Sequence, residues 1–206
     1  MRFRGAFLRL VLPAALAVLW TAAPALGAQS DDDCLTCHGD SGLKTEQGLS
    51  LFVDGANFTA SIHGSAGIAC VGCHADLKKL TDFPHAAKLK PVDCASCHDK
   101  AGADVRDSIH GRPHEGPAPI TVRCKDCHGT HDIRPAKDAL SHTSAMNIPD
   151  TCLSCHLERV KTTLGPGFAG RYKESVHFQA LSKAGLSFSA TCLSCHGGHS
   201  VLPMRD

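Results

Sequence analysis

The longest mainly apolar stretch of the chain runs from Leu10 to Trp20, close to the N-terminus and after three arginines. Small residues follow it, up to Gly27 and Ala28. A basic start, a short apolar run and small residues are typical of a secretory signal peptide. The run is short for a membrane span and contains Pro13, which disfavours the alternative of an uncleaved anchor. We therefore predict a signal peptide over residues 1–28 and export of the remainder.

Residues 29–206 lack the sustained alternation of apolar and polar positions that marks strands. The many glycines and prolines punctuate loops and leave little room for long regular elements. Short helices are expected around Cys152–Lys161 and Gly170–Ala184. This pattern predicts one loop-rich domain with short α-helices and little or no β-sheet.

The sequence Cys-x-x-Cys-His occurs six times and accounts for all 12 cysteines. Two thiols at this spacing can add to the vinyl groups of one haem, and the adjacent histidine then ligates the iron. We therefore expect six haem c groups. We number the motifs 1 to 6 in chain order, with thioether cysteines at Cys34, Cys37, Cys70, Cys73, Cys94, Cys97, Cys124, Cys127, Cys152, Cys155, Cys192 and Cys195, and proximal histidines at His38, His74, His98, His128, His156 and His196.

Other uses of cysteine fit this pattern poorly. Structural zinc sites combine two Cys or His pairs, and a histidine directly after the second cysteine suits a tetrahedral site badly. Disulfides or thioredoxin-like dithiols would give no reason for the histidine in every motif. Iron–sulfur clusters need four thiolates each, again without the histidine.

Eight further histidines are available as distal ligands for six irons. Three follow a serine and an aliphatic residue, two lie three residues after a motif histidine, and one follows Phe83-Pro84. A histidine just after a motif cannot easily reach the far face of its own haem, so these two should ligate neighbouring haems. The six expected distal ligands are, in order of these groups, His63, His110, His177, His131, His199 and His85.

Two histidines, His114 and His142, are weaker candidates, because each is better interpreted as an exposed or second-shell imidazole. Methionine ligation would raise a haem's potential, but only Met146 and Met204 remain after signal cleavage. The sequence therefore predicts mainly bis-histidine coordination.

Composition fits a cofactor-filled interior. The expected mature chain offers about 30 residues per haem, which is too few to bury six macrocycles in an ordinary core. The haems should themselves form the core, and their binding would supply folding free energy. Without the leader the chain has 18 basic and 20 acidic residues, and haem propionates make the holoprotein more acidic. This balance disfavours nucleic acid as a partner.

The chain resembles the low-potential, cytochrome c3-like multihaem c-type cytochromes of anaerobic respiratory bacteria. The resemblance runs from about Asp33 to Pro203 and rests on Ser-Ile-His-Gly before a motif, Cys-His-Gly-Thr-His-Asp-Ile after another, and Asn147–Cys152 leading into a third. It implies that His63, His110, His131, His177 and His199 are distal haem ligands.

The resemblance further implies an electron carrier, not an enzyme. We expect an exported protein in the periplasm, with an extracellular or outer-membrane-associated location as the alternative. Its partners would be redox proteins: other cytochromes, a membrane quinol-oxidising module, a terminal reductase or an extracellular acceptor. Membrane association would occur only through them. Two alternatives stay open, a multihaem reductase of nitrite, hydroxylamine or a sulfur oxyanion with one open haem, and a subunit of an extracellular haem filament.

Overall fold

The computed structural model describes residues 30–112, 121–157 and 169–202. The predicted signal peptide and the candidates His114 and Met204 lie outside these residues. The elements are all helical: α1 (Asp31–His38), α2 (Gly55–Ala60), α3 (Ile62–Ser65), α4 (Cys70–Cys73), the 3-10 turns η1 (Ala75–Leu77) and η2 (Cys94–Ser96), α5 (Asp99–Asp107), α6 (Cys124–His128), α7 (Ile148–His156), the 3-10 turn η3 (Ala169–Glu174), α8 (Val176–Ala184) and α9 (Cys192–His196).

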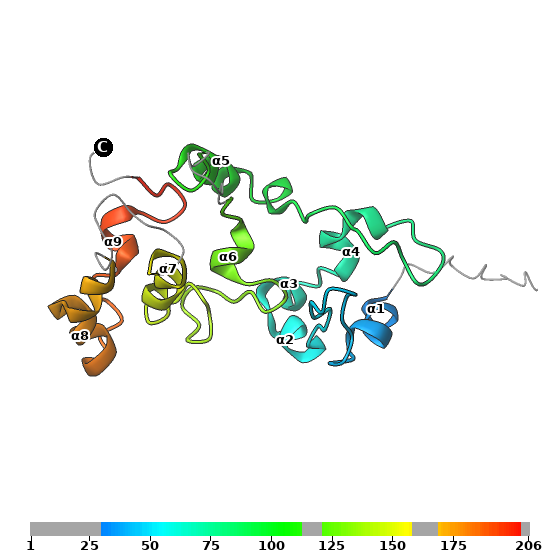
Figure 1. Cartoon of the computed structure of the whole chain (residues 1–206), viewed down its shortest axis with the longest axis horizontal. Helices are drawn as coiled ribbons and strands as arrows, with labels where there is room; N and C mark the ends of the chain where they lie inside the picture. Colours follow the sequence, from blue (N-terminus) through cyan, green and yellow to red (C-terminus); the bar gives the residue numbers. More distant parts are fainter. Residues whose placement is uncertain (1–29, 113–120, 158–168, 203–206) are drawn as a thin grey trace, which may run out of the picture.

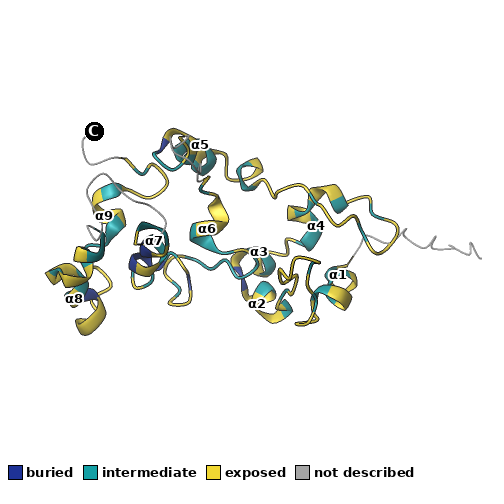
Figure 2. Cartoon of the chain, in the orientation of Figure 1, coloured by how far each residue is buried: buried dark blue, intermediate teal, exposed yellow. Residues whose placement is uncertain are grey.

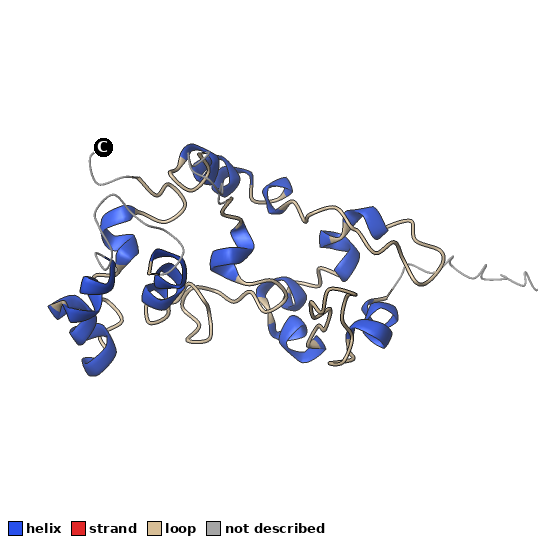
Figure 3. Ribbon diagram, in the orientation of Figure 1, coloured by secondary structure: helices blue, strands red, loops and turns tan. Residues whose placement is uncertain are grey.

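Short helices joined by long loops make up the fold, and the described residues form no sheet (Figure 3). One isolated antiparallel bridge joins Lys44 and Ser50. The predicted fold class is confirmed. The helix expected from Cys152 begins earlier, at Ile148, because Pro149 suits the first helical turn. The helix expected over Gly170–Ala184 is divided by Ser175, whose side chain caps the N-terminus of α8.

The molecule is elongated, and its elements follow one another along the long axis in roughly chain order (Figure 1). Helices α1 to α4 lie at one end, α5 and α6 in the middle, and α7, α8 and α9 at the other end. None of the described helices is long and apolar enough to cross a membrane.

Few of the described residues are buried (Figure 2), and their apolar side chains form hardly any core. Among the described residues, Ile148, Leu153 and Leu181 are the buried hydrophobic ones, whereas Leu140, Val176 and Phe188 are largely exposed. So little buried apolar surface cannot offset the conformational entropy of ordering such a chain. The fold needs a further source of stability.

Candidate haem sites

Four motifs, in α1, α6, α7 and α9, lie wholly within a helix; His74 directly follows α4, and motif 3 is helical only over the 3-10 turn η2. Helices α4, α6 and α9 begin at the first cysteine of their motif, and α1 and α7 end at the motif histidine. Positions i, i+3 and i+4 share one face of a helix. In α1, α6, α7 and α9, helical geometry therefore turns both thiols and the imidazole of the motif toward the same side, as attachment to one haem requires.

Five of the six motif histidines face a second imidazole, and each partner is one of the expected distal ligands. The ring centres lie 5.8–6.3 Å apart: His38 with His85, His63 with His98, His74 with His131, His110 with His156, and His128 with His199.

This spacing fits a metal between the rings and is too wide for direct stacking contact. A metal-bound imidazole nitrogen lies about 2 Å from the metal, so two imidazoles on opposite sides of one ion have ring centres about 6 Å apart. The five pairs thus have the separation that bis-imidazole coordination of an iron demands.

The imidazoles are also held in a ligating state. At motif 1, Nδ1 of His38 lies 2.8 Å from the Leu51 carbonyl oxygen, and Nδ1 of His85 lies 2.9 Å from that of Ala86. A carbonyl at Nδ1 fixes the tautomer and leaves Nε2 free to bind metal. Burial lowers the pKa of four other paired histidines, and so favours the neutral form that binds metal: His74, His128, His131 and His156.

The sixth motif differs. Within the described part of the chain, His196 has no second imidazole at this spacing, and the His177 ring makes no contact with another ring. His142 lies beside Gly129, directly after motif 4, with its Nε2 3.5 Å from a carboxylate oxygen of Asp132. The structure therefore does not bring the predicted ligand His177 to an iron site.

Comparison with known proteins shows which proteins the chain is similar to. Residues 62–157, which hold motifs 2 to 5, match the family described as Cytochrome c3. The multiheme cytochrome MtrA of Shewanella baltica (strain OS185) is 30% identical over 190 residues, which cover 85% of this chain and 48% of that protein. These matches identify a multihaem cytochrome that is similar to the cytochrome c3 family over motifs 2 to 5. It spans about half the length of the curated relative that it matches, and no solved structure matches it.

The cytochrome obtains its second imidazoles from distant parts of the chain. His131 and His199, each just after a motif, lie beside the histidines of motifs 2 and 4 and not beside their own. His63, located before motif 2, lies beside the histidine of motif 3, and His110, located before motif 4, lies beside that of motif 5. Each such pair ties two segments together across one candidate iron site.

Glycines directly after two motifs direct this exchange. Gly129 has φ 81° and ψ −166°, and Gly197 has φ 78° and ψ 176°. This backbone region is accessible essentially to glycine alone. The turn ends α6 and α9 at the motif histidine and sends His131 and His199 toward other motifs. The Cys-His-Gly-x-His pattern already contains this signal.

Successive motifs of the cytochrome contact one another through their first cysteines. The thiols of Cys34 and Cys70 lie close together, as do those of Cys152 and Cys192. Burial, followed by the nearby Asp31 carboxylate, raises the pKa of Cys70 to about 12. Asp31 also accepts a 2.7 Å hydrogen bond from the Cys70 amide, which joins α1 to α4. At the other end, α7 packs against α9.

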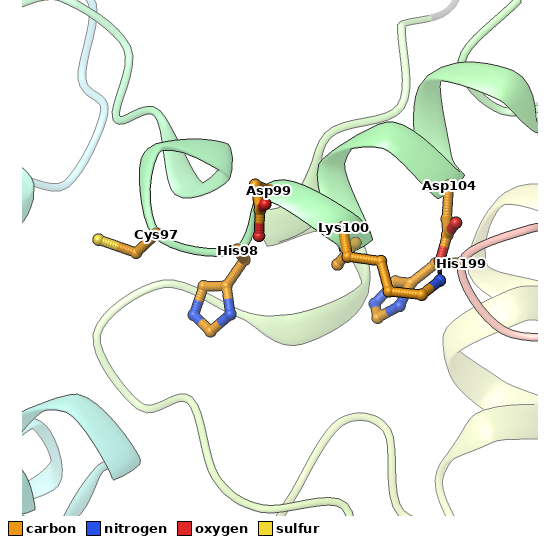
Figure 4. Close-up of a pocket in the computed structure, with 7 residues that line it drawn as sticks. Cys97, His98, Asp99, Lys100, Asp104 and His199 are labelled. Carbon is orange, nitrogen blue, oxygen red and sulfur yellow. Dashed lines mark hydrogen bonds and ion pairs between the residues drawn. The ribbon is translucent and has the colours of Figure 1, made fainter.

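Space for a cofactor is evident beside motif 3 (Figure 4). A cavity of about 440 Å³ is bordered by Cys97 and His98, by the first turns of α5, and by His199 from the segment after α9. Its volume falls in the range of cofactor sites, and it adjoins two of the five imidazole pairs. The residues present fit covalently held haem.

Proposed function

We propose that the chain holds six c-type haems, five of them between two imidazoles, and relays electrons along its length. The observation that carries this proposal is the set of five imidazole pairs, each made of one motif histidine and one distant histidine. Cysteines of all six motifs would supply the thioether bonds.

Bound haem would supply one-electron redox chemistry. The chain's own task is to hold and tune it. Two neutral imidazoles per iron favour a low potential, and backbone carbonyls at Nδ1 strengthen the ligands at motif 1. Because five sites are filled on both sides by protein, those sites leave no position for a substrate.

Continuity along the molecule supports a relay. Motifs 1 and 2, 3 and 4, and 5 and 6 each lie close together at one pair of thiols. Between these pairs, Cys73 neighbours Cys94 and Cys127 neighbours Cys155. The haem attachment points therefore follow the chain order from one end of the elongated molecule to the other.

The predicted leader and the haem chemistry favour the periplasm, with redox proteins as partners. We infer an electron donor such as a membrane quinol-oxidising module or another cytochrome, and an acceptor such as a terminal reductase or an extracellular oxidant. The acidic balance of the holoprotein favours basic docking surfaces on these partners.

The proposal is tested on the holoprotein by mass spectrometry and by near-infrared magnetic circular dichroism of the oxidised form. We expect a mass increment of six haems and five haems with the charge-transfer band of bis-imidazole iron. Fewer haems, or fewer than five bis-imidazole signals, would contradict it.

A second candidate is a reductase that uses the iron of motif 6, because His196 lacks a facing imidazole in the described residues. Turnover of nitrite, hydroxylamine or sulfite with a dithionite-reduced dye separates the two functions. A relay reduces these substrates no faster than its own chemically unfolded form does.

A further inference from the structure

The cytochrome is built from three units of two motifs, which we call unit 1 (motifs 1 and 2), unit 2 (motifs 3 and 4) and unit 3 (motifs 5 and 6). Three contacts join unit 1 to unit 2. The Ile62 amide donates to the Ile133 carbonyl oxygen at 2.8 Å, His63 faces the histidine of motif 3, and His131 faces the histidine of motif 2.

The same three contacts join unit 2 to unit 3. The Ile109 amide donates to the Val201 carbonyl oxygen at 2.9 Å, His110 faces the histidine of motif 5, and His199 faces the histidine of motif 4. In both junctions the Ser-aliphatic-His segment of one unit binds the segment that follows the second motif of the next. The units thus exchange histidines in both directions.

Unit 3 carries the corresponding segment, Ser175-Val176-His177, which makes none of the three contacts with the residues that the structure describes. Within the described residues, the Val176 amide has no acceptor, the His177 ring has no partner, and the iron site of His196 has no second imidazole. These three unmatched groups belong to unit 3, at the end of the molecule opposite α1, where α8 is the outermost helix (Figure 1).

The segment is nevertheless held firmly in place. The Ser175 hydroxyl caps α8 by accepting from the Phe178 amide, as Ser61 caps α3. The Tyr172 hydroxyl donates to the Ala190 carbonyl oxygen at 2.8 Å, and the Ser189 hydroxyl donates to that of His177 at 2.8 Å. His177 is therefore presented outward by a built scaffold.

We propose that this end of the molecule is a docking surface for a further two-motif unit carried by another multihaem cytochrome, with histidines exchanged as at the two internal junctions. His177 is donated to an iron of the partner, and the iron held by His196 takes its distal imidazole from the partner. The inference rests on the proposed haem content and follows from continuity with two junctions already present in the fold.

A second copy of this chain suits the surface less well. Unit 1 of another copy cannot act as the next unit, because the motif 1 histidine already faces His85 of its own chain and no histidine follows motif 2 within η1. His199 is likewise committed to motif 4. An apolar rim of Val176 and Phe188, which are 75% and 84% exposed, suits burial against a partner.

The first arm of the test uses imidazole as a stand-in for the partner's histidine. Magnetic circular dichroism of the oxidised holoprotein should show one high-spin haem in six, which converts to a low-spin bis-imidazole form as imidazole is added. His177→Ala should leave this signal unchanged, because His177 does not serve motif 6. His85→Ala is the positive control and should add a second high-spin haem.

The second arm uses a haem peptide with one Cys-x-x-Cys-His attachment and an open iron position as a stand-in for the partner's haem. The holoprotein should bind one such peptide through His177, with at least a tenfold loss of affinity in His177→Ala and no change in His142→Ala. Light scattering should show a single-chain mass without the peptide.

Six low-spin haems without imidazole, undiminished peptide binding by His177→Ala, or dimers that lose the high-spin signal would each overturn the docking proposal. These outcomes leave six haems and five bis-imidazole signals intact, whereas failure of the proposed function would appear as a lower haem mass or as fewer than five bis-imidazole signals. The two results are therefore distinguishable.

Discussion

Histidine placement carries most of the chemistry of this cytochrome. An imidazole becomes an axial ligand only if it is neutral, correctly oriented and about 6 Å from its opposite ring. Ten histidines meet the distance condition here, and burial keeps several of them neutral. His142, which lies beside Asp132 and is about half exposed, does not face a motif histidine.

Replacement of His110 by methionine tests a single ligand. We expect His110→Met to keep six haems per chain, because the thioether bonds are untouched, and to raise the potential of one haem in six, because a thioether favours ferrous iron more than imidazole does. Protein-film voltammetry measures the shift. His142→Met is the matched control and should leave the voltammogram unchanged; an identical trace for both variants would reject His110 as a ligand.

The helices that carry motifs are short because each has one task, to turn the groups of its motif to one side and then stop. Gly129 and Gly197 end α6 and α9 with a backbone conformation that other residues avoid. Gly185 also has positive φ, at 67°, but it closes α8 in the ordinary left-handed cap. The same residue type therefore serves ligand placement in one helix and simple termination in another.

Alanine at these glycines separates the two roles. We expect Gly197→Ala to cost about 1–3 kcal/mol in the free energy of unfolding and to convert the motif 4 haem to high spin, because His199 is displaced. Gly185→Ala should cost about 1 kcal/mol and leave the spin state unchanged. Guanidinium unfolding and magnetic circular dichroism measure the two effects. Equal spectra for the two variants would contradict the assigned role of Gly197.

The whole molecule is an elongated series of three similar units with scarcely any apolar core among its described residues. Its connectivity comes from histidines that pass between units and from a few backbone hydrogen bonds, such as Ile62 to Ile133. Bound haem would both fill the interior and crosslink the units through its two ligands. Folding and cofactor attachment should therefore be coupled.

Production of the chain without haem attachment tests this coupling. With the motif cysteines replaced by alanine, we expect circular dichroism with little helical signal and no cooperative thermal transition, because Ile148, Leu153 and Leu181 alone cannot sustain a fold. The holoprotein should show a clear helical signal and a cooperative thermal transition. A cooperative transition in the haem-free chain would show that the polypeptide has an independent core.

The sequence alone is sufficient to predict haem attachment, the loop-rich helical fold and most of the candidate ligands. The spacing of cysteine and histidine in each motif predicts haem attachment, and the glycines, prolines and missing strand alternation predict a loop-rich helical fold, which is confirmed. The Ser-aliphatic-His and Cys-His-Gly-x-His patterns single out the histidines that the structure pairs, together with His85. These features are readable because they depend on neighbours within a few residues.

The tertiary structure alone decided which imidazole faces which motif. His63 reaches past motif 2 to motif 3, and His131 reaches back from motif 4 to motif 2, so proximity along the chain is a poor guide to the pairing. His177 has the same local pattern as His63 and His110, yet it faces no motif in the described residues. A ligand is defined by what lies opposite it, and that depends on how the three units are packed together.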